Sequence, residues 1–209
     1  MNIQSAYNKW SSSYDEDKNL TRDLDAEIVR NEFANIKFDS ILEIGCGTGK
    51  NTNFFSEIAD KVNAIDFSEG MILKAKEKIK SGNVQFTQAD IIHKLPIETS
   101  TIELVACSLI LEHIENLDFI FSEANRCLKK KGKIFINELH PFRQYEGKKA
   151  TFINDGKTTV IDAFVHNISD FTNAAINNGF KLLKLNEFWH KLDKNKLPRI
   201  LSLLFVKDN

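Results

Sequence analysis

The sequence predicts an α/β protein whose core is a doubly wound, mostly parallel sheet of seven strands. From residue 40 onward, short apolar runs alternate with segments of helical periodicity, the pattern of parallel strands joined by crossover helices. The first run, residues 41–44, leads through Gly45, Gly47 and Gly49 into a helix. Two apolar runs near the C-terminus, joined by a short polar link, predict an antiparallel pair at one edge of the sheet.

The strands and helices follow from the period of the apolar residues along the chain. Strands are expected at residues 41–44, 61–65, 84–87, 101–107, 133–138, 180–188 and 199–206. A short helix is expected within residues 1–20, and further helices at 21–36, 48–59, 68–80, 114–128 and 168–178.

Helix ends and turns have candidate signals of their own. Thr21 and Ser68 are candidate N-caps. The run Lys129-Lys130-Lys131-Gly132 is expected to close a helix, with lysines at the negative end of its dipole and Gly132 in the left-handed conformation. The segment 152–164 predicts a hairpin that turns at Asn154-Asp155-Gly156.

Composition limits the classes of function. The 209 residues, 42% of them hydrophobic, suffice for one domain with a substantial core. The formal net charge of −1 gives no global positive field that would attract nucleic acid or an anionic membrane. No apolar run approaches the roughly 20 residues needed to span a bilayer, and the first residues carry no export signal. We therefore expect a cytoplasmic protein with no membrane and no nucleic-acid partner.

The glycine loop predicts a ligand-binding turn. The free amides at the start of a helix attract an anionic group, and residues without side chains let a ligand approach the backbone. Two cofactor classes share such turns, and a merely connecting turn is a third interpretation. The dinucleotide fingerprint requires a glycine at the position that Lys50 occupies.

A carboxylate follows the second strand, where ligands of parallel sheets bind. Asp66 lies seventeen residues beyond Gly49, and a fixed carboxylate can accept hydrogen bonds from both hydroxyls of a ribose. Capping the next helix is its alternative role, but Ser68 is already available for that.

The ordered set Glu43-x-Gly45-x-Gly47-x-Gly49, Asp66, Asp90 and the segment Ser108 to His113 resembles class I S-adenosylmethionine-dependent methyltransferases. Within this family, the stretch from about Trp10 to Glu138 resembles the ubiquinone/menaquinone-biosynthesis group, methyltransferase type 11. The resemblance implies the Rossmann-like methyltransferase fold and S-adenosyl-L-methionine as cofactor. A lysine-rich turn before the fifth strand departs from the family's usual sequence, but lies away from the site.

The resemblance implies a set of cofactor contacts. Glu43 would organise the glycine loop and the cofactor's amino group, Asp90 would accept from the adenine amino group, and Ser108 would lie beside the methionine part. The complete set is Glu43, Gly45, Cys46, Gly47, Gly49, Asp66, Phe67, Met71, Asp90, Ile91, Ser108, Leu109 and, from the N-terminal segment, Tyr14.

It also implies a division of the single domain. Residues 1–37 would form an N-terminal helical cap, 38–139 the cofactor-binding core, 140–167 an inserted substrate lid, and 168–209 the C-terminal helix and edge strands.

Methyl transfer from a sulfonium is an in-line displacement, so an enzyme chiefly holds the reactants in line and excludes water. Some acceptors also need a general base, for which histidine is the usual side chain. His113 and His140 follow the fourth and fifth strands and are the candidates, while Arg143 and Tyr145 are candidate substrate contacts. The three cysteines lack metal-ligand spacing, and no metal site is expected.

The leading hypothesis is therefore a methyltransferase for a small-molecule acceptor. A nicotinamide-dependent oxidoreductase shares the first turn but differs at Lys50. An RNA or protein methyltransferase is a further alternative, although Ser108-Leu109-Ile110-Leu111 stands where nucleic-acid amino-methylating enzymes typically have Asn/Asp-Pro-Pro-aromatic. A cofactor-binding module without catalytic activity is the remaining alternative.

Overall fold

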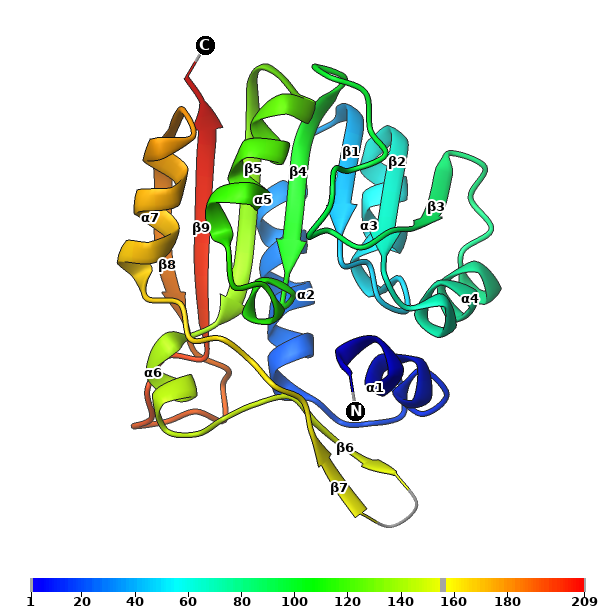
Figure 1. Cartoon of the computed structure of the whole chain (residues 1–209), viewed down its shortest axis with the longest axis vertical. Helices are drawn as coiled ribbons and strands as arrows, with labels where there is room; N and C mark the ends of the chain where they lie inside the picture. The colour runs from blue at the N-terminus through cyan, green and yellow to red at the C-terminus, as the bar shows by residue number, and fades with distance from the viewer. Residues whose placement is uncertain (1, 155–156, 209) are drawn as a thin grey trace.

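The computed structural model describes residues 2–154 and 157–208 and contains the predicted seven-stranded sheet (Figure 1). The strands lie in the order β3-β2-β1-β4-β5-β9-β8, and β9 alone runs opposite to the other strands of the sheet. Their bounds are β1 (Phe38–Ile44), β2 (Ala59–Asp66), β3 (Val84–Gln88), β4 (Ile102–Ser108), β5 (Leu128–Leu139), β8 (Phe180–Phe188) and β9 (Ile200–Lys207). The predicted α/β class and the antiparallel C-terminal pair are confirmed.

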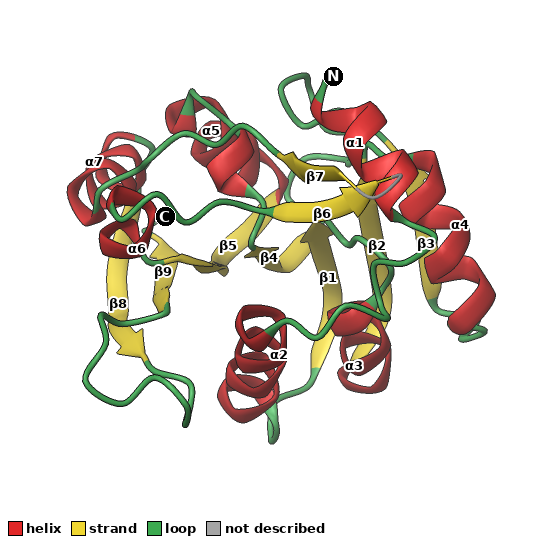
Figure 2. Ribbon diagram, turned by 90° about the horizontal axis from the view of Figure 1, so that it is seen from below, coloured by secondary structure: helices red, strands yellow, loops and turns green. Residues whose placement is uncertain are grey.

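Helices cover both faces of this sheet (Figure 2). On one face, α2 (Leu20–Phe33) and α3 (Lys50–Ile58) bury a cluster around Phe33 and Phe135. On the other, α5 (Leu117–Cys127) and α7 (Ile168–Asn177) pack around Phe121, while α4 (Glu69–Lys78) packs on β2 and β3. Since the winding direction reverses between β1 and β4, the crevice beyond their carboxyl ends is where this architecture binds ligands.

Two predictions about helix ends are wrong. Asn19, not Thr21, caps α2, because its side chain accepts from the amides of Thr21 and Arg22. The lysine run does not close α5. Helix α5 ends at Cys127, and Leu128 already pairs with Ile102 as the first residue of β5, so the strand ladder takes the backbone groups that a helix cap would have satisfied. Lys131, rather than Gly132, has the positive φ of 61°. The Ser68 cap of α4 is confirmed.

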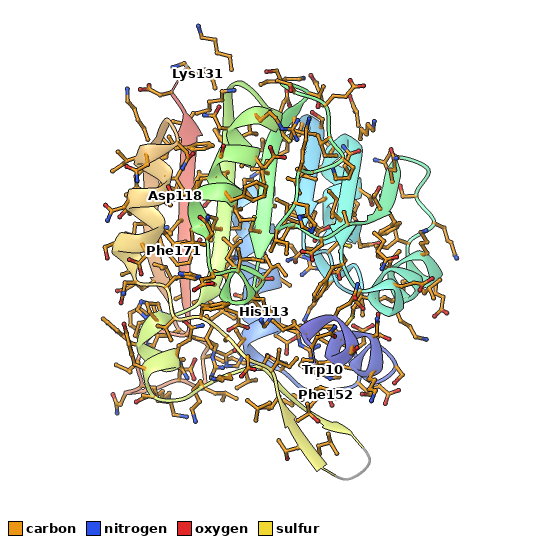
Figure 3. The ribbon with its side chains drawn as sticks, viewed as in Figure 1. Trp10, His113, Asp118, Lys131, Phe152 and Phe171 are labelled. Carbon is orange, nitrogen blue, oxygen red and sulfur yellow. The ribbon has the colours of Figure 1, made fainter. Side chains whose placement is uncertain are left out.

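The residues predicted to form a cap (1–37) and an inserted segment (140–167) pack against each other. The cap begins with α1 (Ile3–Trp10), and the inserted segment contains α6 (Pro141–Tyr145) and the hairpin β6 (Thr151–Asn154) and β7 (Lys157–Val160). The predicted hairpin is confirmed, although residues 155 and 156 of its expected turn lie outside the described residues. Trp10 stacks on Phe152 with ring centroids 5.2 Å apart (Figure 3), so α1 and β6 form a separate small core.

None of the helices in the described part of the chain combines the length and hydrophobicity that crossing a bilayer requires.

Candidate functional site

A trough of three adjoining cavities lies beyond the carboxyl ends of β1, β2 and β4. The largest, of about 250 Å³, is lined by Glu43 and Ser108, and another, of about 180 Å³, by Asp90 and Ile91. A narrow cavity of about 40 Å³ lies between them, and Gly45 lines all three. Gly45 has a φ of 75°, and a Cβ there would come within 2.7 Å of the side chain of Ile110. Glycine is therefore required to shape the middle of the trough.

Buried carboxyl groups gather at the 250 Å³ end of the trough. Glu43 is only 4% exposed and accepts a hydrogen bond from the Thr52 hydroxyl, and burial raises its pKa to about 8. Asp25 of α2 accepts from the side-chain amides of Asn51 and Asn137, both at 2.8 Å, and burial raises its pKa as well. Because buried carboxylates favour a cationic partner, this end suits an ammonium group.

A buried cation faces the same cavity. The Arg22 guanidinium donates to the backbone oxygens of Tyr14 and Asp17 and lies 3.9 Å from the centroid of the Tyr14 ring. Arg22, Asp25 and Glu43 therefore offer both signs of charge at one end of the trough, as an amino acid requires.

Asp66 lies beneath the glycine loop at the middle of the trough. One carboxylate oxygen accepts from the Gly47 amide and the other from the Ser68 amide, both at 2.8 Å. Burial raises the Asp66 pKa to about 6, while these amide hydrogen bonds act to lower it. Each oxygen retains a further lone pair, so the carboxylate can still accept hydroxyl groups from a ligand.

The 180 Å³ end has mostly apolar walls. Phe67, Ile91, Ile110 and Ile114 line it together with Asp90. Among the residues that the structure describes, the Asp90 carboxylate accepts only a local bond, from the Ile92 amide at 3.2 Å. A flat apolar ring with a polar edge fits such walls.

The structure thus assembles nearly all the predicted cofactor residues. Each of them lines one of the three cavities except Gly49, which begins α3 with a φ of 83°. A Cβ on Gly49 would come within 2.5 Å of Ile79, so its role is to let α3 and α4 approach closely.

Three predicted catalytic or substrate residues lie outside these cavities. His140 is fully buried, its Nδ1 accepts from the Phe142 amide and its Nε2 lies 2.7 Å from Glu187, so neither nitrogen is free to take a proton from a ligand. Arg143 donates to the backbone oxygens of residues 197 and 198. Tyr145 is 65% exposed and donates to Asn167. His140 and Arg143 therefore tie the inserted segment to residues 187, 197 and 198, whereas Tyr145 bonds within the segment.

His113 borders the 180 Å³ cavity but is also fully engaged. Its Nε2 lies 2.8 Å from the Tyr7 hydroxyl, and its Nδ1 lies 3.1 Å from the backbone oxygen of Asp162. Since a carbonyl can only accept, Nδ1 carries the proton and Tyr7 donates to Nε2. Burial lowers the His113 pKa, which favours this neutral form. Figure 3 shows His113 between the cap and the core.

Sequence reasoning missed Arg22, Asp25 and Asn51. A signal existed for Asp25, which stands between the buried Leu24 and Ile28 on the apolar stripe of α2. A buried acid in such a stripe needs hydrogen-bonding partners, and this could have marked it as part of a site.

A fourth cavity, of about 90 Å³, opens beside the trough. We name it the Trp10 chamber. Its walls include Tyr7, Trp10, Arg22, Leu109, Glu112 and Lys149. Tyr14, Arg22 and Leu109 line both this chamber and the 250 Å³ cavity, so the two spaces are separated by a shared wall.

Comparisons with known proteins agree with this geometry. Residues 42–136 match the family model described as "Methyltransferase domain". A malonyl-[acyl-carrier protein] O-methyltransferase of Hamiltonella defensa is 28% identical over 137 residues, which cover 66% of this chain and 52% of that protein. A demethylmenaquinone methyltransferase of Lactococcus lactis is 30% identical over 150 residues, which cover 66% of this chain and 59% of that protein. The chain therefore spans about half the length of these relatives.

The fold, too, resembles that of solved methyltransferases. The crystal structure of an S-adenosylmethionine dependent methyltransferase from Mesorhizobium loti superposes with a TM-score of 0.73 at 20% identity, covering 86% of this chain and 96% of that one. The family model identifies residues 42–136 as a methyltransferase domain, and the whole sheet has the strand arrangement of these solved methyltransferases. The predicted resemblance to methyltransferases is confirmed at the level of this domain and of the fold.

Proposed function

We propose that the protein transfers a methyl group from S-adenosyl-L-methionine to a small-molecule acceptor. The observation that carries the proposal is the continuous trough through Glu43, Gly45, Asp66 and Asp90 within a methyltransferase domain. Its charged end, its central carboxylate and its apolar end suit an amino acid, a ribose and a flat base in that order. The three parts of the cofactor have the same order.

The residues of this chain would hold the cofactor by complementary charge. Glu43 and Asp25 would accept from its ammonium group, Arg22 would pair with its carboxylate, and Asp66 would accept from the ribose hydroxyls. When bound, the cofactor supplies a sulfonium methyl: the acceptor atom bonds to that carbon, the carbon–sulfur bond breaks and its electron pair stays on sulfur. The protein's part is alignment and exclusion of water.

No described histidine lining the trough or the Trp10 chamber has a free nitrogen, because His113 is bonded at both ring nitrogens. We therefore place positioning ahead of general-base catalysis, and assign His113 to holding the cap and the inserted segment together. The division into cap (1–37), core (38–139), lid (140–167) and C-terminal part (168–209) is proposed with this function.

A small acceptor is supported by the size of the Trp10 chamber and by the balanced charge of the chain. The chamber's volume of about 90 Å³ is well under half that of the 250 Å³ cavity of the trough. The net charge of −1 offers no general attraction for RNA. The names of the two relatives point to different acceptors, so they do not select one for this chain.

Binding and transfer test the proposal separately. S-adenosylhomocysteine should raise the melting temperature in a concentration-dependent way, whereas NADH should not. The protein should then move radiolabelled methyl from S-adenosylmethionine into the low-molecular-weight fraction of a metabolite extract. Stabilisation by NADH alone would overturn the cofactor assignment. Label found only in acid-precipitable protein or RNA would overturn the small-molecule acceptor.

A further inference from the structure

The Trp10 chamber lies where an acceptor would meet the cofactor. Leu109, on the wall that the chamber shares with the trough, has a φ of 55°, which is unusual for a residue with a side chain. Three consecutive backbone amides hold it there. The Leu109 amide donates to the backbone oxygen of Asn137 at 2.8 Å, and the amides of Ile110 and Leu111 donate to one carboxylate oxygen of Glu138 at 3.0 and 2.7 Å. Strain that is held this firmly is common at functional sites.

The charges that line the chamber are unbalanced. Arg22 is only 9% exposed, yet the described residues place no carboxylate within ion-pair distance of its guanidinium. Lys149, at the exposed start of the inserted hairpin, likewise has no ion-pair partner among the residues the structure describes. At the trough, by contrast, Lys50 pairs with Asp23 and Lys78 with Asp15, each at 2.6 Å. Because an unpaired buried cation is unfavourable, the chamber favours an anion.

Glu112 is the only acidic side chain among the described residues that line the chamber, and it already has a partner. One of its oxygens accepts from the side-chain amide of Gln144 at 3.1 Å. Burial raises the Glu112 pKa, which favours its uncharged form and weakens its competition for the cations.

Aromatic rings form a further part of the wall, from Tyr7, Trp10 and Tyr14. Tyr7 and Trp10 stack with ring centroids 5.8 Å apart, and Trp10 also stacks on Phe152. The ring atoms that reach the chamber offer an apolar surface on the same wall as the two cations.

We propose that the Trp10 chamber binds a small acceptor that carries a carboxylate, with the anion between Arg22 and Lys149 and the apolar body against Tyr7 and Trp10. The inference rests on the proposed function and specifies the acceptor class. Arg22 faces both spaces, and the N–H groups that it does not use for the backbone oxygens of Tyr14 and Asp17 can meet the cofactor's carboxylate on one side and the acceptor's on the other. Of the two cations, only Lys149 reports on the chamber alone.

Paired probes test the charge preference on protein saturated with S-adenosylhomocysteine. Benzoate and hexanoate are compared with benzamide and hexanamide by ligand-observed NMR titration. Each acid should bind about tenfold more tightly than its amide, because charge-assisted hydrogen bonds are about twice as strong as neutral ones. Lys149→Ala should weaken binding of the acids about threefold and leave the amides unchanged.

Lys148→Ala is the matched control, since Lys148 is the exposed neighbour that does not line the chamber. Equal binding of acids and amides, no binding of either at about 10 mM, or equal effects of the two lysine substitutions would overturn the proposal. The rise in melting temperature that S-adenosylhomocysteine causes is measured on the unsubstituted protein and on both lysine variants, and it separates the outcomes. If that shift is lost in the unsubstituted protein, the proposed function fails. If it persists while the charge preference is absent, only the acceptor class fails.

Discussion

The trough and the Trp10 chamber are neighbours built in different ways. The trough is formed mainly by strand ends and loops of the core, and the backbone fixes its key carboxylate, since Asp66 accepts from the Gly47 and Ser68 amides. The chamber needs the cap, the turn after β4 and the start of the inserted hairpin to meet. The difference indicates that the core sheet and its loops provide most of the proposed cofactor site, while packing between separate segments provides the proposed acceptor site.

Contacts between side chains hold the chamber together. Trp10 stacks on Phe152, and His113 joins Tyr7 of α1 to the backbone of Asp162. Figures 1 and 2 both show α1 beside the β6–β7 hairpin and away from α6 and α7. These few contacts connect the cap to the inserted segment, so we expect that region to open more readily than the sheet.

The largest expected effect tests the trough. Asp66→Ala should weaken S-adenosylhomocysteine binding on the order of 100-fold, because it removes a carboxylate that would accept from the ligand and also holds the Gly47 amide. Isothermal titration calorimetry measures the change. Asp60→Ala, on the exposed start of the same strand, is the control and should bind as the unsubstituted protein does. Affinity unchanged by Asp66→Ala would mean that the strand end does not contact the cofactor.

A smaller effect should show that the region around the Trp10 chamber opens independently of the strands beneath the trough. Trp10→Ala removes the stacked contact with Phe152 and should increase hydrogen exchange about tenfold in α1 and β6, which corresponds to roughly 1.4 kcal/mol of local opening. Amides of β1 and β4 should exchange as before. Hydrogen exchange with mass spectrometry measures both regions.

Trp189→Ala is a matched control, because Trp189 is half exposed and lies outside the cap. It should leave exchange in α1 unchanged. Equally increased exchange in β1 after Trp10→Ala would show that cap and sheet open as one unit, which would remove the distinction between the two regions.

The smallest expected effect is a pH dependence of the charged end of the trough. Glu43 has a pKa of about 8 in the folded protein, raised by burial above its ordinary value near 4.5. Its contribution to stability is therefore full below about pH 4.5 and is lost as the pH rises through about 8. Because an ammonium group prefers the ionised carboxylate, S-adenosylhomocysteine affinity should rise several-fold between pH 6 and pH 8.

Titration calorimetry at both pH values checks this sign. Glu43→Gln should flatten most of the rise, whereas Glu57→Gln on the exposed side of α3 should retain it. An affinity that falls over this range in the unsubstituted protein would contradict an ammonium group bound by Glu43.

The sequence by itself determined the sheet, the glycine loop and the residues at the strand ends. Parallel strands bring their carboxyl ends to one edge, so residues as distant as Glu43, Asp66 and Asp90 could be placed together from periodicity and the family resemblance alone. The same local logic located the Ser68 cap, which depends only on the residues of its own helix end.

Tertiary structure alone decided which polar residues outside the strands face the cavities. His140 and Arg143 were expected at the site, but their partners are Glu187 and the backbone of residues 197 and 198, about fifty positions away. Arg22 and Asp25 were missed for the same reason, because α2 reaches the trough only after it packs on the sheet. In irregular segments and caps, the direction of a side chain depends on contacts between distant residues, and no local period encodes those contacts.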